Sequence, residues 1–172
     1  EHAERRSRAF VHNLARIRDL CRESGITFVV ATQQFRSTLI PVEKLHGMTY
    51  DQEVELVRTQ VAEGRIGPHM LPVSEKTFDL RLEGNDEMAP RTVAMLYPPR
   101  AMLVHARAMA ELRAWASRES VALADVIHAL DGDRDLMVNW VHLTGQANAI
   151  VARELARVIR AQLANRPPAH SG

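Results

Sequence analysis

The sequence predicts an α/β fold in which helices cover a parallel β-sheet. Helical patterns alternate with two short, β-branched apolar runs at residues 26–32 and 121–127, an order typical of parallel sheets covered by helices. The chain has 172 residues, of which 46% are hydrophobic and 25% charged, the composition of one ordinary globular domain. Parallel sheets normally contain more than two strands, so we expect the missing strands to lie upstream of residue 1.

The first helix and strand follow from apolar spacing. Residues 4–23 carry apolar side chains at three- and four-residue steps, which predicts an amphipathic helix. Gly25 suits the left-handed position that ends a helix. Thr32, Gln33 and Gln34 stand at the carboxyl end of the first strand, where open α/β sheets bind ligands; they either line a substrate pocket or simply begin a loop. The apolar stripe of the helix comprises Phe10, Leu14, Ile17 and Cys21, widened by Val11 and Leu20.

The middle of the chain is predicted to leave the core and return to it. Residues 35–90 read as a long, lid-like insertion that holds one helix, capped by Thr49 or Asp51. Residues 91–96 read as a short strand or a strap, and a long helix follows from Pro99. Its Met102, Met109 and Trp115 are interpreted as core residues. The second strand then ends near Asp125, and residues 166–172 form a flexible tail.

A histidine near the C-terminus is the strongest candidate for chemistry. An apolar, strand-like run carries Asn139 and then His142, and an amphipathic helix follows. A histidine with a hydrogen-bonding residue three positions before it and a packed helix behind it is well placed to act as a general base. Val141 and Leu143 would flank it with apolar pocket surface, and Thr144 can cap the helix. The alternative is a structural histidine in a loop.

The block V-N-W-V-H-L-T-G-Q-A-N at residues 138–148 resembles the C-terminal block of the SGNH, or GDSL-like, hydrolase superfamily. In that family D-x-x-H-L-T-x-x-G-N precedes the last helix. Residues 10–34 and 106–130 are similar to two earlier helix–strand blocks of the family, and they occur in the family's order. The resemblance implies a three-layer α/β/α fold with a parallel, flavodoxin-like sheet, of which residues 1–165 would be the C-terminal part.

The resemblance also implies a reaction. Such a protein would be a serine-dependent carboxylic-ester hydrolase, or O-acyl esterase, acting on a small-molecule or glycan ester without metal or organic cofactor. His142 matches the family's general base, and Asn139 occupies the place of its aspartate. The family's nucleophilic serine lies on an N-terminal Gly-Asp-Ser strand end, which this segment lacks. We therefore expect the serine outside the segment, and the segment alone to be inactive.

Asn139 departs from the family pattern. An amide cannot supply the negative charge that stabilises an imidazolium, and it can favour the wrong imidazole tautomer. The site then either works as a serine–histidine dyad, uses Asp135 in place of Asn139, or is weakened. The alternative function is accordingly a weakened or inactive SGNH-like module that binds a glycan or a protein partner.

Composition bounds the remaining possibilities. A formal net charge of +1 offers no argument for nucleic-acid binding, and no apolar run approaches the length of a membrane span. The single cysteine excludes an internal disulfide, and the other histidines lack metal-ligand spacing. Because the natural N-terminus is expected to be missing, compartment cannot be judged, and oligomeric state stays open.

Overall fold

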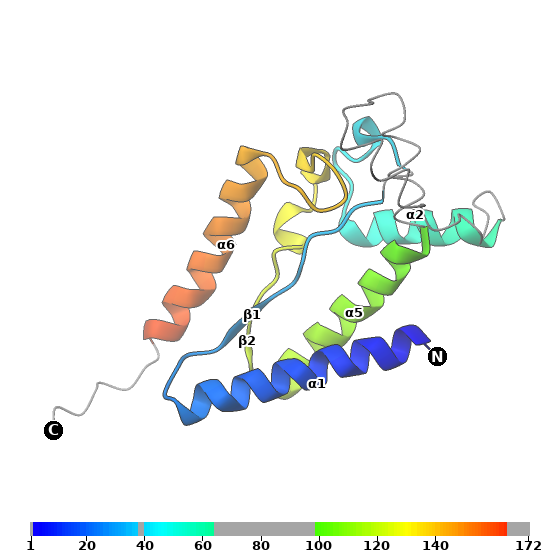
Figure 1. The fold of residues 1–172 in the computed structure, drawn as a ribbon. Coiled ribbons are helices and arrows are strands. Elements are labelled where there is room, and N and C mark those ends of the chain that lie inside the picture. The colour runs from blue at the N-terminus through cyan, green and yellow to red at the C-terminus, as the bar shows by residue number, and fades with distance from the viewer. Residues whose placement is uncertain (1, 38–39, 64–98, 165–172) are drawn as a thin grey trace, which may run out of the picture.

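A computed structural model describes residues 2–37, 40–63 and 99–164 and shows a mostly helical α/β fold with a small parallel sheet (Figure 1). The rest of the predicted insertion, the strand or strap at 91–96 and the tail at 166–172 lie outside these residues. The elements in chain order are α1 (His2–Glu23), β1 (Val29–Ala31), η1 (Val42–Lys44), α2 (Tyr50–Ala62), α5 (Pro99–Arg118), β2 (Ala122–Ala124), η2 (His128–Leu130), η3 (Arg134–Leu136) and α6 (Gly145–Ala164).

The two predicted strands pair with each other. β1 and β2 run parallel, with Val29 opposite Ala122 and Ala31 opposite Ala124. Both are shorter than the apolar runs that predicted them, because regular pairing extends over only three residues of each. Since the strands are parallel, their carboxyl ends meet at one edge of the sheet. The polar side chains that follow each strand are therefore brought together there.

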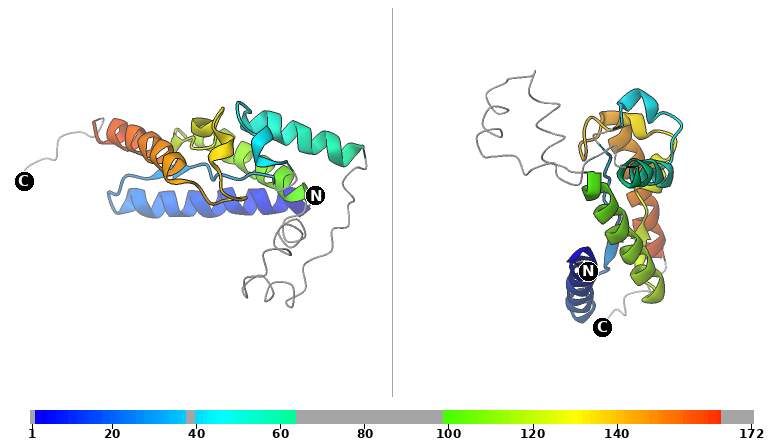
Figure 2. Two further views of the ribbon diagram at one scale, coloured as in Figure 1. Left: turned by 90° about the horizontal axis from the view of Figure 1, so that it is seen from above. Right: turned by 90° about the vertical axis from the view of Figure 1, so that its right-hand side faces the viewer.

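Each face of the strand pair packs against different helices. On one face Val29, Ala122 and Ala124 contact Val158 and its neighbours on α6. On the other face Val30 joins the core that α2 and α5 build. Alternate residues of a strand point to opposite faces, and this explains why neighbours in β1 enter different clusters. Figures 1 and 2 show α6 on one side of the strands and α1 and α5 on the other.

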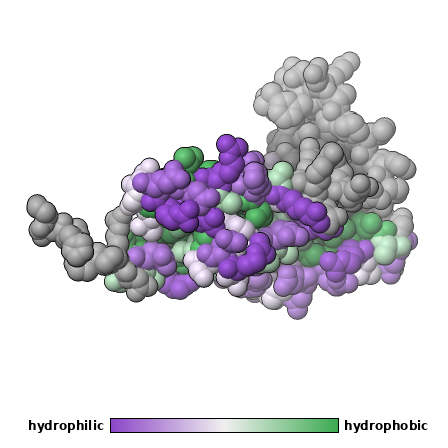
Figure 3. All heavy atoms as spheres, turned by 90° about the horizontal axis from the view of Figure 1, so that it is seen from below, coloured by the Kyte–Doolittle hydropathy of each residue, from purple (hydrophilic) through white to green (hydrophobic). Residues whose placement is uncertain are grey.

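Helix α1 buries less of its apolar stripe than its spacing suggests. Its main helical neighbour is α5, and Leu14 is only partly buried. Phe10, Ile17 and Leu20 remain 39%, 48% and 63% exposed. One packed neighbour covers one side of a helix, so the wide stripe stays partly in solvent. Figure 3 shows hydrophilic and hydrophobic side chains mixed on the face that it views.

Local signals for helix ends are confirmed. Thr49 caps α2 in a reciprocal capping box with Gln52. Gly25 has φ +66°, the left-handed conformation expected after α1. Thr144 Oγ1 accepts the Ala147 N–H at 3.2 Å at the start of α6. These contacts are short-range in sequence, which is why the residue pattern alone reveals them.

The core centres on α5 and includes the described part of the predicted insertion. Met102, Met109 and Trp115 are at most 5% exposed, which confirms the interpretation of this stripe as core. Tyr50 and Val57 of α2 belong to the same cluster, so α2 is an integral part of the packed fold. None of the described helices combines the length and apolarity that crossing a bilayer requires.

Candidate functional site

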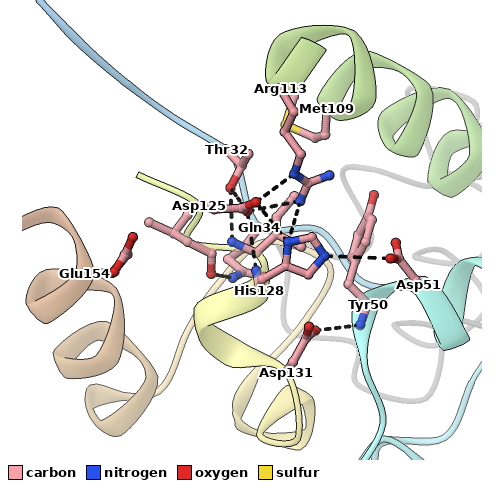
Figure 4. A network of polar contacts seen from close by, with 12 residues as sticks. Thr32, Gln34, Tyr50, Asp51, Met109, Arg113, Asp125, His128, Asp131 and Glu154 are labelled. Atoms are coloured by element: carbon pink, nitrogen blue, oxygen red, sulfur yellow. Dashed lines mark hydrogen bonds and ion pairs between the residues drawn. The ribbon is translucent and has the colours of Figure 1, made fainter. Parts of the chain in front are cut away.

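A polar network joins the carboxyl ends of the two strands (Figure 4). Its centre is Asp125, the residue directly after β2. Thr32 Oγ1 donates to Asp125 Oδ1 at 3.0 Å, and Arg113 of α5 donates Nε to Oδ2 at 2.7 Å and Nη2 to Oδ1 at 3.0 Å. The ring of His128 places Nδ1 2.9 Å from Oδ2. One carboxylate thus ties both strands to α5 and to η2.

These contacts determine the ionisation of Asp125. Its partial burial by itself would raise the carboxyl pKa. Hydrogen bonds from Arg113 and His128, together with the arginine charge, outweigh burial and hold the pKa of Asp125 well below its usual range. The carboxylate is therefore ionised throughout the physiological pH range, and it acts only as a hydrogen-bond acceptor.

The polar residues after β1 have different roles from one another. Thr32 is 2% exposed, and its Oγ1 also accepts the Ile127 N–H at 3.0 Å, so its side chain connects the two strand ends. Gln33 has an exposed side chain, and its N–H points to Met109 Sδ at 3.3 Å. Gln34 is 5% exposed and donates to the carbonyl of Val126. Of these three, only Gln33 offers its side chain to solvent.

A buried ion pair extends the network away from the sheet. Arg134 Nε donates to Glu53 Oε2 at 2.6 Å, and both side chains are 0% exposed. Arg134 Nη1 also donates to Gln34 Oε1 at 3.2 Å, while Nη2 donates to the Phe35 carbonyl. Ser37 donates its N–H to Glu53. The pair therefore fastens the chain segment that leaves β1 to α2 and to η3.

A second polar pair, buried Tyr50 and half-buried His105, lies beside the chain segment that leaves β1. Tyr50 Oη is 2.7 Å from His105 Nδ1, and the Phe35 ring stacks on His105 with ring centroids 4.9 Å apart. Burial lowers the pKa of His105 to about 4, and the positive charges of Arg134 and Arg113 act in the same direction. His105 is therefore neutral near pH 7.

The segment that carries Asn139 and His142 is not a strand, which corrects the expectation from its apolar residues. It follows η3 and forms only one isolated bridge, between Met137 and Leu143. The Asn139 side chain explains the turn, because its Oδ1 accepts the N–H groups of Val141 at 3.1 Å and His142 at 2.9 Å. A side chain that bonds the backbone two and three residues ahead competes with strand pairing.

This turn is held against the chain that leaves β1. The Arg36 N–H donates to the Trp140 carbonyl at 3.0 Å, and Arg36 Nη1 donates to the Met137 carbonyl at 3.1 Å. The ring centroids of Phe35 and Trp140 are 6.2 Å apart. Arg134 bonds the carbonyl of Phe35, so the buried ion pair and the histidine turn share one anchoring segment.

The ring of His142 is exposed and held by Asn139. Nδ1 lies 2.8 Å from Asn139 Nδ2 and 3.0 Å from Asn139 Oδ1. Val141 and Leu143, which were expected to flank the ring as pocket surface, are half-buried. Asp135 does not replace Asn139: its Oδ2 lies 3.3 Å from His46 Nδ1 instead.

Sequence reasoning overlooked a second pair with the same spacing. Asp125 and His128 are three residues apart, as are Asn139 and His142. The Asp125 carboxylate is in direct contact with the His128 ring. The D-x-x-H pattern at residues 125–128 was visible in the sequence, but it overlaps the predicted strand 121–127. Across the described ranges, no group of three or more His, Cys, Asp or Glu side chains is arranged to hold a metal ion.

Comparison with known proteins returns no relative. No protein-family model, curated protein or solved structure matches the chain.

Proposed function

We propose that this chain contributes the general-base histidine of a serine-dependent carboxylic-ester hydrolase, with His142 as the base. The contact between Asn139 and the His142 ring carries the proposal. The exposed imidazole is held at Nδ1 by a residue three positions before it, and Nε2 takes no part in that contact. Such a contact fixes the orientation of the ring, as the partner of the catalytic histidine does in a serine hydrolase.

The proposed mechanism needs a serine nucleophile, and no sequence motif among these 172 residues identifies one. His142 Nε2 would take the hydroxyl proton as the serine attacks the ester carbonyl, and it would return that proton to the leaving alcohol. The substrate would be a small-molecule or glycan ester, and the acyl transfer would need no cofactor. In this proposal, the two strands and the helices on their faces belong to a larger three-layer, flavodoxin-like sheet.

A second candidate function rests on the chemistry of Asn139. Its amide oxygen already accepts two backbone N–H groups, and an amide carries no negative charge to stabilise a protonated ring. The same turn would then serve a weakened or inactive module that binds a glycan or a protein partner.

Substitution of His142 tests the hydrolase proposal. In the full-length protein, His142→Ala is expected to reduce hydrolysis of p-nitrophenyl acetate to the background rate, because the serine loses its proton acceptor. His46→Ala is the matched control: His46 has 78% side-chain exposure and also contacts a side chain, Asp135, and its loss should leave the rate unchanged. Full activity in the His142→Ala protein would overturn the base assignment, and absence of activity in the wild-type protein would favour the binding module.

A further inference from the structure

The structure contains two histidines held in the same way by partners of different chemistry. Asp125 contacts Nδ1 of His128, and Asn139 contacts Nδ1 of His142; in each pair the partner is three residues before the histidine. A carboxylate only accepts hydrogen bonds, whereas a side-chain amide both donates and accepts. The identity of the partner therefore determines which ring nitrogen carries the proton in the neutral histidine.

For His128 the partner requires a proton on Nδ1. Asp125 is ionised, and its Oδ2 lies 2.9 Å from Nδ1. Arg113 Nη2 is farther from Nδ1, at 3.3 Å, and it already donates to Asp125 Oδ1 at 3.0 Å. The shorter contact is thus an Nδ1–H bond to the carboxylate. Asp51 Oδ2 lies 3.7 Å from Nε2, beyond hydrogen-bond distance, so Nε2 of neutral His128 is left unprotonated.

For His142 the backbone determines the orientation of the amide. Asn139 Oδ1 accepts from the N–H groups of Val141 and His142, so its two lone pairs are used and the amide cannot be turned over. The group left for Nδ1 is Asn139 Nδ2, which is also the closer atom, at 2.8 Å against 3.0 Å for Oδ1. Nδ2 is a donor, so Nδ1 must accept.

We infer that Asn139 holds neutral His142 with its proton on Nε2, the reverse of the tautomer that Asp125 imposes on His128. The exposed nitrogen of resting His142 is then a hydrogen-bond donor, suited to a carboxylate or carbonyl oxygen of a ligand. Proton acceptance at Nε2 requires the ring first to change tautomer. Asn139 is thus a positioning residue that acts through His142.

The tautomers can be measured on the chain as it stands. With ¹⁵N-histidine labelling, the shifts and couplings of the ring nitrogens, recorded at mildly alkaline pH, distinguish protonated from unprotonated nitrogen. His142→Gln and His128→Gln spectra assign the signals. We expect an unprotonated Nδ1 for His142 and a protonated Nδ1 for His128, which serves as the internal control. A protonated Nδ1 on His142 in the wild-type chain would refute the inference.

A single isosteric substitution tests the role of Asn139. In Asn139→Asp the carboxylate can only accept, so the His142 proton is expected to move to Nδ1 while the His128 signals stay unchanged. If the His142 tautomer is the same in Asn139→Asp as in the wild type, Asn139 does not control it and the inference fails.

The catalytic consequence rests on the proposed function, and activity tests it separately. In the full-length protein, Asn139→Asp should raise ester hydrolysis by up to about 10⁴-fold, the size of the tautomer effect in the serine-protease triad. If His142→Ala leaves activity intact, the hydrolase proposal fails while the tautomer assignment stands. If the tautomer changes and the rate does not, the inference about proton acceptance is wrong.

Discussion

Replacing Arg134 with methionine is expected to lower the free energy of unfolding by about 3–5 kcal/mol, the cost of leaving one partner of a buried ion pair alone. Arg134 and Glu53 are both 0% exposed, with Nε and Oε2 2.6 Å apart. Burial raises the pKa of Glu53, and the charge of Arg134 opposes that rise. Without the arginine, an uncompensated carboxyl group would remain in the core. Urea denaturation followed by circular dichroism measures the loss.

A double variant separates the destabilisation caused by one unpaired buried charge from the net contribution of the ion pair to stability. Arg134→Met combined with Glu53→Gln removes both charges, so its destabilisation should be smaller than that of Arg134→Met alone. Arg157→Met is the matched surface control, because Arg157 pairs with Glu154 on α6 but is 67% exposed, and little change is expected there. Equal effects of Arg134→Met and Arg157→Met would contradict the assignment of a dominant buried pair.

Acid is expected to destabilise the fold through His105. Its pKa falls to about 4 on burial, from 6.5 in an accessible histidine. The unfolded chain then binds more protons than the folded chain between these values, so stability is lost as the pH falls from 6.5 toward 4. The shift corresponds to at most about 3 kcal/mol. Asp125 acts in the same direction but at lower pH, because its pKa is depressed below the ordinary value of 3.8.

Removing the titrating ring should remove this acid sensitivity. The double variant Tyr50→Phe and His105→Phe replaces both ends of a 2.7 Å contact with apolar rings, which avoids leaving one buried polar group alone. Its stability should decline less between pH 6.5 and 4 than that of the wild type, because the titrating imidazole is gone. His12→Gln, at an exposed position of α1, should keep the wild-type profile. An unchanged decline in the double variant would show that other groups cause it.

Part of the candidate site could be predicted because its contacts are local. Asn139 and His142 are three residues apart, so a motif match places them together before any fold is known, and Thr144 follows as a cap for α6. The shape of the segment could not be predicted in the same way. Its apolar residues favour a strand, but the Asn139 side chain bonds two backbone N–H groups and bends the chain.

The α-helices, the positions of the two strands, the cap at Thr49 and the left-handed Gly25 after α1 follow from the residue pattern, because all depend on periodicity or on residues a few positions apart. The long-range partners of the polar side chains emerge only from the packed fold. Thr32 meets Asp125, and Glu53 meets Arg134, across more than 80 residues of sequence. No local pattern encodes such pairs, since they depend on which elements pack together. The Asp125–His128 pair is itself local, but only the packing of β1 and α5 against β2 adds Thr32 and Arg113 to it.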